Sequence, residues 1–171
     1  MNLQSNDFEL FGLAQEFAQD LTAIDACWKS LQREAHPDQF STQGAAAQRV
    51  AMQWSVRINE AYQRLKTPLK RAAYLCELNG SPVNAHSNTA MPKSFLLQQM
   101  QWRENLEEAN SASALEVLSA DVSLAEKTLL QQCENLLDAQ HDYAQAVSVV
   151  RCLMFIDKFS EDLAQRFDAF E

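Results

Sequence analysis

Apolar side chains recur along this chain at steps of three and four residues, which is the spacing of one face of an α-helix. Two sets near the C-terminal end illustrate the pattern: Leu115, Leu118, Val122, Ala125, Leu129, Cys133 and Leu136, and then Ala146, Val150, Leu153, Ile156, Leu163, Phe167 and Phe170. A many-stranded β architecture needs frequent turn residues, whereas this chain has only 3 Gly and 4 Pro. The sequence therefore predicts an all-α fold.

The least regular stretch is NGSPVNAHSNTAMP, residues 79–92, which holds one Gly and two Pro. Its composition is that of a linker, so we expect two domains, 1–78 and 93–171. The first half predicts four helices: a short one near Asp7, a plausible N-cap, and others around 21–35, 43–66 and 68–80. The second half predicts three longer helices, which makes a three-helix bundle.

Charge and cysteine usage restrict the possible partners and the compartment. The net charge is −9, and residues 76–171 hold all of it, with 6 basic and 15 acidic side chains. Nucleic-acid binding needs clustered Lys and Arg, so we expect no nucleic-acid partner. No apolar run approaches the length of a membrane span, and the N-terminus lacks a secretory signal. The four cysteines are widely spaced, which disfavours a metal site and favours free thiols in the cytoplasm.

The stretch WKSLQREAHPDQFS, residues 28–41, predicts a helix that ends at a His-Pro-Asp tripeptide. Pro37 disfavours the helical conformation at His36, and Asp38 then projects a carboxylate that can accept two bonds from an arginine. Lys29 and Arg33 lie four residues apart on the preceding helix and share one face. A basic ridge ending in an acid is a plausible protein-docking surface, although Asp after Pro is also common in ordinary turns.

Catalysis by this tripeptide is the weaker interpretation. His36 and Asp38 are suited to acid–base chemistry, but the sequence places no nucleophile beside them and no glycine-rich loop follows. We therefore expect no catalytic residues, no cofactor and no enzymatic activity.

Three motifs together resemble a J-domain: FELFGL at 8–13, HPD at 36–38, and INEAYQRLKTPLKRAAYL at 58–75. More narrowly, the chain is similar to J-type co-chaperones of the HscB family, which act in iron–sulfur cluster assembly. The similarity continues in FLLQQMQWRENLEE at 95–108 and VVRCLMFIDKF at 149–159, while residues 112–138 contribute little.

This resemblance implies two partners. The N-terminal J-domain would bind a DnaK-type, HscA-like chaperone and stimulate its ATPase through His36, Pro37 and Asp38, with Lys29 and Arg33 as docking charges. The C-terminal bundle would bind the iron–sulfur scaffold protein IscU and deliver it. Family members commonly have an aromatic residue before HPD and Lys after it, whereas this chain has Ala35 and Gln39. A second basic surface is expected on the next helices, from Arg49, Arg57, Arg64, Lys66, Lys70 and Arg71.

Helical geometry suggests where the scaffold would bind. At 100° per residue, Phe95, Trp102 and Leu106 share one face of their helix, and Leu96, Leu97 and Met100 lie nearly opposite. We expect the first face to be core, and the second to be exposed with Gln101 and Glu104 at its edge. Phe155 projects away from the stripe of the last helix and is expected to join the exposed patch, which is typical of a partner site. Contact of this patch with the J-domain is the alternative.

Other functions remain open. A J-domain co-chaperone with a different client would have the same sequence features in its N-terminal half. A structural coiled-coil protein with an incidental HPD, and a small hydrolase using His36, are the remaining hypotheses.

Overall fold

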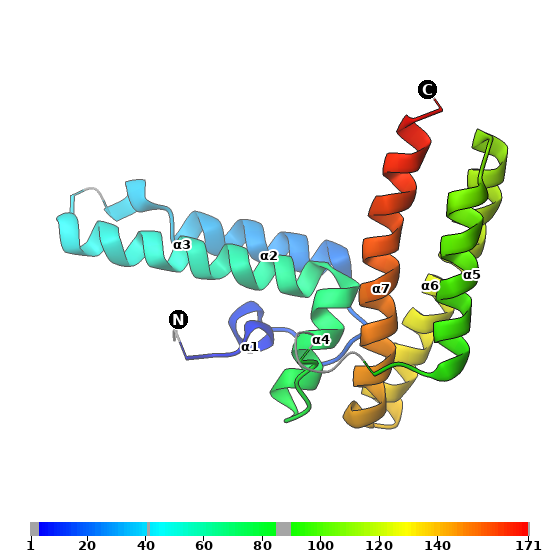
Figure 1. Cartoon of the computed structure of the whole chain (residues 1–171). Coiled ribbons are helices and arrows are strands. Elements are labelled where there is room, and N and C mark those ends of the chain that lie inside the picture. Colours follow the sequence, from blue (N-terminus) through cyan, green and yellow to red (C-terminus); the bar gives the residue numbers. More distant parts are fainter. Residues whose placement is uncertain (1–3, 41, 85–89, 171) are drawn as a thin grey trace. The chain divides into compact units, whose positions relative to one another are not determined.

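The computed structural model describes residues 4–40, 42–84 and 90–170, and every regular element in these ranges is helical (Figure 1). The all-α prediction is therefore confirmed. The chain divides into two compact units, Met1–Leu75 and Cys76–Glu171.

The N-terminal unit is built on a helical hairpin. A short helix α1 (Asp7–Phe11) precedes α2 (Leu21–Glu34), a 3₁₀ turn η1 (Pro37–Phe40) and the long α3 (Ala45–Lys66). Figure 1 shows α2 and α3 side by side and antiparallel, as the sequence predicts. The unit closes with the first part of α4 (Pro68–Leu78). Its fully buried apolar side chains include Phe8, Ile24, Ile58, Leu65 and Ala72.

Polar contacts hold α2 against α3 as well. The Trp28 indole stacks on Tyr62 at 4.8 Å and donates to the Asn59 amide oxygen at 2.9 Å. Gln32 donates to the same oxygen at 2.7 Å and accepts from the Ser55 hydroxyl at 2.9 Å. Buried and half-buried polar groups that are fully paired favour one arrangement of two helices over others. These bonds fix the rotation of α2, and with it the direction of its exposed face.

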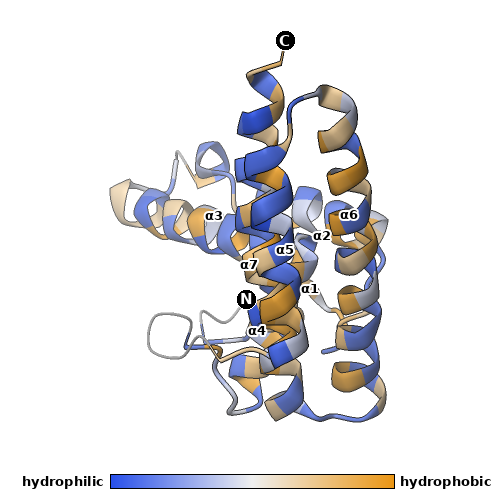
Figure 2. Ribbon diagram, turned by 45° about the vertical axis from the view of Figure 1, so that its right-hand side comes forward, coloured by the Kyte–Doolittle hydropathy of each residue, from blue (hydrophilic) through white to orange (hydrophobic). Residues whose placement is uncertain are grey.

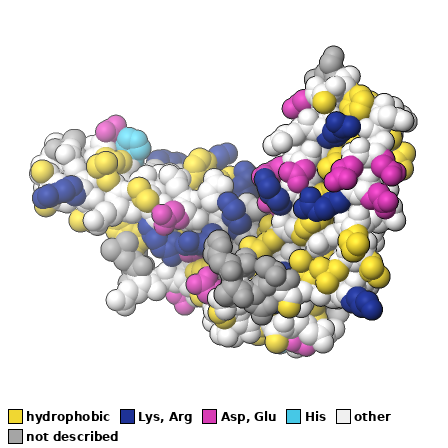
Figure 3. All heavy atoms as spheres, in the orientation of Figure 1, with side chains coloured by type: hydrophobic (Ala, Val, Ile, Leu, Met, Phe, Trp, Pro, Cys, Tyr) yellow, Lys and Arg dark blue, Asp and Glu magenta, His cyan; other side chains and the backbone are white. Residues whose placement is uncertain are grey.

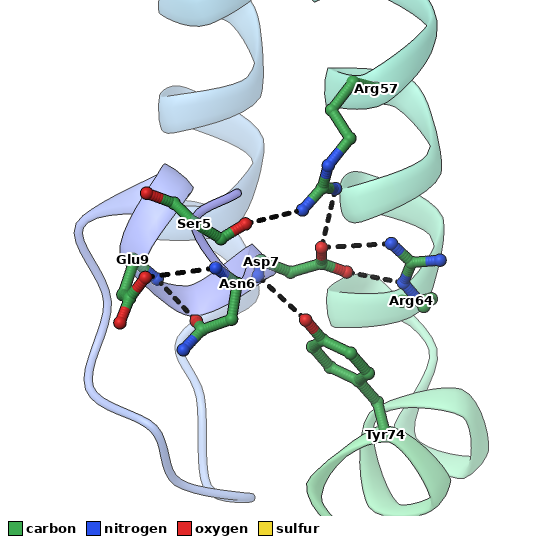
Figure 4. A network of polar contacts seen from close by, with 7 residues as sticks. All are labelled: Ser5, Asn6, Asp7, Glu9, Arg57, Arg64 and Tyr74. Carbon is green, nitrogen blue, oxygen red and sulfur yellow. Dashed lines mark hydrogen bonds and ion pairs between the residues drawn. The ribbon is translucent and has the colours of Figure 1, made fainter. Parts of the chain in front are cut away.

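Asp7 was expected to be the N-cap of α1, and this prediction is wrong. Asn6 is the cap: its side chain accepts from the Glu9 N–H at 2.9 Å, and the Glu9 carboxylate accepts from the Asn6 N–H at 3.1 Å. This reciprocal pair is a capping box. Asp7 instead begins the helix and is fully buried (Figure 4). Glu9, three residues after Asn6, is the sequence signal that identifies Asn6 as the cap.

The buried Asp7 carboxylate ties α1 to α3. It lies 2.6 Å from Arg57 Nη1, and Arg64 donates to both of its oxygens (Figure 4). The hydrogen bond from Arg64 to Asp7 raises the pKa of the guanidinium. The Asp7 backbone N–H donates to the Tyr74 hydroxyl at 3.0 Å, so α4 joins the same network. Two arginines around one buried carboxylate offset much of the cost of taking that charge out of water.

This network corrects the expected second basic surface. Arg57 and Arg64 are bound to Asp7, Arg71 is buried and donates to the Leu65 carbonyl, and Lys66 donates to Tyr62. Of the six cations expected there, only Arg49 and Lys70 are exposed without a partner in the part of the chain that the structure describes. The other four stabilise the unit.

The C-terminal unit is a three-helix bundle of α5 (Lys93–Glu108), α6 (Ala112–Glu134) and α7 (Tyr143–Asp168). A single π-helical turn, Asn135–Ala139, ends α6. Hydrophilic and hydrophobic stretches alternate along these helices in Figure 2, and the hydrophobic ones supply the core. That core contains Trp102, Ala109, Leu115, Leu118, Val122, Ile156, Phe159 and Leu163. The predicted stripes of all three helices contribute to this core, but Phe170 does not, because it lies beyond the end of α7 and is 39% exposed.

The domain boundaries at 78 and 92 stay a prediction, and residues 85–89 of the expected linker lie outside the described residues. The described part of that linker is packed at one point, because Val83 is buried. Arg151 on α7 donates to the Val83 carbonyl at 2.9 Å and to the Ala90 carbonyl at 3.4 Å. Arg151 thus binds the linker at Val83 and again at Ala90, and so holds it against the C-terminal unit.

The four cysteines are free thiols. Cys76, Cys133 and Cys152 are buried, and only Cys27 on α2 is partly exposed. Burial raises the pKa of Cys133 to about 12 and the pKa values of Cys76 and Cys152 to about 11. No group of three or more His, Cys, Asp or Glu side chains in the described ranges is arranged to hold a metal ion. The helices searched in those ranges are also too short or too polar to cross a membrane.

Candidate functional site

The first candidate surface is the turn between α2 and α3, which carries the tripeptide His36, Pro37 and Asp38. Helix α2 ends at Glu34, and the Ala35 N–H donates to the Leu31 carbonyl at 3.0 Å as the last helical bond. Pro37 then opens η1, where the Gln39 N–H donates to the His36 carbonyl at 3.0 Å. Pro fits the first position of such a turn because it has no N–H to leave unpaired.

The Asp38 side chain is available to a partner. Its backbone N–H donates to His36 Nδ1 at 3.3 Å. The Asp38 carboxylate lies 3.5 Å from the same nitrogen and is 90% exposed. In Figure 3, a histidine and a carboxylate lie on the surface at the η1 end of the α2–α3 hairpin. The tripeptide therefore presents an acid from a stiffened turn.

Lys29 and Arg33 stand on the exposed face of α2, leading up to the turn. Both side chains are exposed, and neither forms an ion pair in the part of the chain that the structure describes. The expected arrangement of basic groups before the acid is therefore present in the geometry. Glu34, which receives a bond from Ser30, is the acidic neighbour on the same helix.

An apolar groove lies beside the turn, lined among others by Ala35, Phe40, Val50 and Trp54. Val50 has the helical spacing of the stripe that continues through Trp54 to the buried Ile58, but it is 51% exposed. The reason is that α2 ends at Glu34 while the first turns of α3 extend past it. Beyond the end of α2, the short η1 turn packs against α3 and leaves a groove whose wall is formed by this stripe.

The second candidate surface is the outer face of α5. Trp102 is fully buried, whereas Leu96, Leu97 and Met100 are exposed, as predicted. Figure 3 shows hydrophobic side chains gathered on the surface of this unit, over the region of α5. Gln101 and Glu104 are exposed next to them, and the Gln101 amide donates to Glu104 at 3.4 Å. The predicted edge of the patch is thus itself hydrogen bonded.

Phe155 differs from the expectation of an exposed ring. It is half-buried and packs against the core, stacked on Phe159 at 5.7 Å and edge-on to Phe95 at 5.9 Å. The Arg103 guanidinium lies 5.3 Å from the centre of the Phe155 ring and 4.0 Å from Asp162. Helix α5 lies on the side to which Phe155 projects, so the ring enters the space between α5 and α7.

On α6, two exposed apolar residues were not predicted. Val117 and Leu124 on α6 are 71% and 65% exposed. They lie off the buried stripe of their helix and are seven residues apart, which is two helical turns. Their positions outside the buried stripe of α6 are a sequence signal of the same kind as that of Leu96, Leu97 and Met100 on α5.

Comparison with known proteins identifies the family. The family description "HSCB C-terminal oligomerisation domain" matches residues 91–164. A co-chaperone protein HscB homolog of Bordetella petrii is 46% identical over 92% of this chain and 93% of its own length. The homolog of Burkholderia cenocepacia is 41% identical over 100% of this chain and 99% of its own length.

Solved structures agree with this fold. Chaperone HscB from Vibrio cholerae is 33% identical and matches with a TM-score of 0.85 over 98% of this chain and 100% of that one. Human co-chaperone protein HscB, at 24% identity, matches with a TM-score of 0.91 over 97% of this chain and 84% of that one, which supports the fold. With a J-domain hairpin, a three-helix bundle and full-length relatives of this kind, the chain belongs to the HscB family of co-chaperones in iron–sulfur cluster assembly.

Proposed function

We propose that this protein stimulates the ATPase of a DnaK-type, HscA-like chaperone and delivers an IscU-type iron–sulfur scaffold protein to it. The observation that carries the first half is the Asp38 carboxylate, which is 90% exposed on a stiffened turn. An exposed carboxylate held in one direction can accept two parallel bonds from an arginine of the chaperone. Lys29 and Arg33 would steer the turn toward an acidic surface.

The second half rests on the α5 surface. Leu96, Leu97 and Met100 expose apolar area on one helix, with Glu104 beside them. An exposed apolar patch with a polar rim is typical of a protein-docking surface. We assign scaffold binding to this patch, with Phe155 at its margin. The free thiols fit a reducing compartment such as the cytoplasm.

An ATPase assay tests this function. The chaperone is measured alone, with this protein, with the scaffold, and with both. We expect stimulation by this protein, and a larger effect when the scaffold is also present.

The variant Asp38→Asn should lose most of the stimulation, because a neutral amide cannot form a charge-assisted pair with an arginine. The control Asp168→Asn removes an exposed carboxylate at the end of α7 and should behave as wild type. Equal stimulation by both variants would contradict the role of the turn. Stimulation of the chaperone without any scaffold binding would instead favour a co-chaperone with a different client.

A further inference from the structure

The three most exposed large apolar side chains of the described residues all belong to the C-terminal unit. They are Met100 on α5 at 67%, and Val117 and Leu124 on α6 at 71% and 65%. Met100 belongs to the surface already assigned to the scaffold. Val117 and Leu124 have no role in the proposed function, and each exposes apolar area to water.

Contacts between α5 and α6 show on which side these residues lie. Trp102 and Gln98 of α5 both donate to the Asp121 carboxylate of α6, at 2.6 and 3.4 Å. Val117 is four residues before Asp121 and Leu124 three residues after it, so both neighbour Asp121 on the surface of α6. Asp121 is exposed, whereas the core side of this helix carries Leu118 and Val122. Val117 and Leu124 therefore flank the α5–α6 contact on its solvent side.

The corresponding side of α5 carries part of the known patch. Leu97 and Gln101 each precede one of the residues that contact Asp121, and both are exposed. Further along, Asn105 and Glu108 of α5 line a groove together with Val117 and Asp121 of α6. The exposed surface can therefore be followed from Leu97 across the polar residues Gln101, Asn105 and Glu108 to Val117 on α6, within one three-helix bundle.

Interface size makes this continuation significant. Stable protein–protein interfaces bury about 800 Å² on each partner and involve about 20–30 residues a side. Three side chains on α5 are too few for such an interface, so a bound partner must reach neighbouring helices. Beyond Phe155 the exposed surface of α7 becomes charged, with Asp157, Lys158 and Glu161. On α6, the exposed side chains next to the groove include the apolar Val117 and Leu124 on either side of Asp121.

We infer that Val117 and Leu124 extend the scaffold-docking surface across the α5–α6 groove. The scaffold would then contact both α5 and α6, in addition to Phe155 on α7. This inference rests on the proposed scaffold binding. The matching surface of the scaffold is apolar and flanked by Lys or Arg, because Glu104 and Glu108 border the docking surface and the C-terminal half of the chain is acidic. Opposite charges at the rim of an interface increase the association rate more than they increase the affinity.

Calorimetric titration of the purified IscU-type scaffold into the full-length protein tests the inference. The double variant Val117→Ala/Leu124→Ala should weaken binding roughly tenfold, as expected for apolar contacts outside the central hot spot. Ala favours helix, so the fold should persist, and thermal unfolding followed by circular dichroism checks this. Val56→Ala on α3, where Val56 is 58% exposed, is the matched control and should bind as wild type.

Three outcomes would overturn the inference. If Leu96→Ala/Met100→Ala weakens binding and Val117→Ala/Leu124→Ala does not, the scaffold stays on α5 and only this inference fails. If the wild-type protein does not bind the scaffold, the proposed function fails as well. If light scattering finds a dimer that the α6 variant dissociates, while scaffold affinity is unchanged, a second copy of this chain occupies the α6 surface instead.

Discussion

Two aspartates near the ends of the α2–α3 hairpin illustrate how burial decides the role of a side chain. Asp7 is fully buried between Arg57 and Arg64, whereas Asp38 is 90% exposed. Both were predicted at helix or turn boundaries, because Asp is common there. The sequence correctly identified Asp38 as an exposed acid, but it could not reveal the arginines of Asp7, which lie 50 and 57 positions further along the chain. Long-range pairing depends on the folded arrangement.

Replacing the buried carboxylate should destabilise the N-terminal unit. Asp7→Asn leaves two half-buried arginines without their counter-charge, and we expect the free energy of unfolding to fall by about 2–4 kcal/mol. Asn6→Ala removes only the N-cap and should cost about 1 kcal/mol. Urea denaturation of both variants measures the difference. An Asp7→Asn protein as stable as Asn6→Ala would mean that the ion pairs contribute little.

At the scale of the elements, helical periodicity predicted which helices form but not where their partners end. The stripe of α3 is buried at Ile58, Ala61 and Leu65, yet Val50 lies in a groove because α2 does not reach that far. Phe155 was assigned to the surface because the angle on its own helix suggested it, and the neighbouring α5 covers it. The angular position of a side chain around its own helix does not predict where the neighbouring helix packs.

The proposed role of Lys29 and Arg33 on α2, electrostatic steering toward the chaperone, can be tested. Reversing their charge with Lys29→Glu/Arg33→Glu should slow association with the chaperone several-fold at low salt, and the difference from wild type should shrink as salt increases. Stopped-flow association rates at two salt concentrations measure this. Lys127→Glu on α6 makes the same kind of change on the other unit and should leave the rate unaltered. A rate change independent of salt would argue against electrostatic steering.

At the scale of the whole molecule, the two units differ in the charge that they expose. Residues 1–75 hold 8 basic and 8 acidic side chains, whereas the net charge of −9 falls on the remainder. In the N-terminal unit, four of the expected surface cations are used internally. The charge asymmetry is a property of the sequence itself, whereas the amount of positive charge that is free to meet a partner was overestimated from the sequence.

The buried thiols of the C-terminal unit predict a loss of stability in alkali. Their pKa values are raised to about 11 and 12 in the folded protein, above the value of 9.0 taken for an unburied thiol. The unfolded chain therefore loses these protons first, and stability falls as the pH rises above 9. Between pH 9 and pH 10 the loss is about 1 kcal/mol per thiol.

Denaturation with urea at these two pH values measures the loss. Cys133→Ala should reduce it by about 1 kcal/mol, because one titrating thiol is gone. An unchanged pH dependence in this variant would show that other groups cause the effect. Below about pH 8 the thiols are protonated in both states and should contribute almost no pH dependence.

The unequal exposure of the cysteines has a practical consequence. Three of the four thiols are buried, and Cys27 alone is partly exposed, on the same helix as Lys29 and Arg33. A maleimide dye added to the native, wild-type protein is thus directed to α2, next to the proposed chaperone-docking face. The protein carries its own attachment point for a fluorescent reporter, and encounters with a chaperone can be followed by anisotropy without engineering a single cysteine.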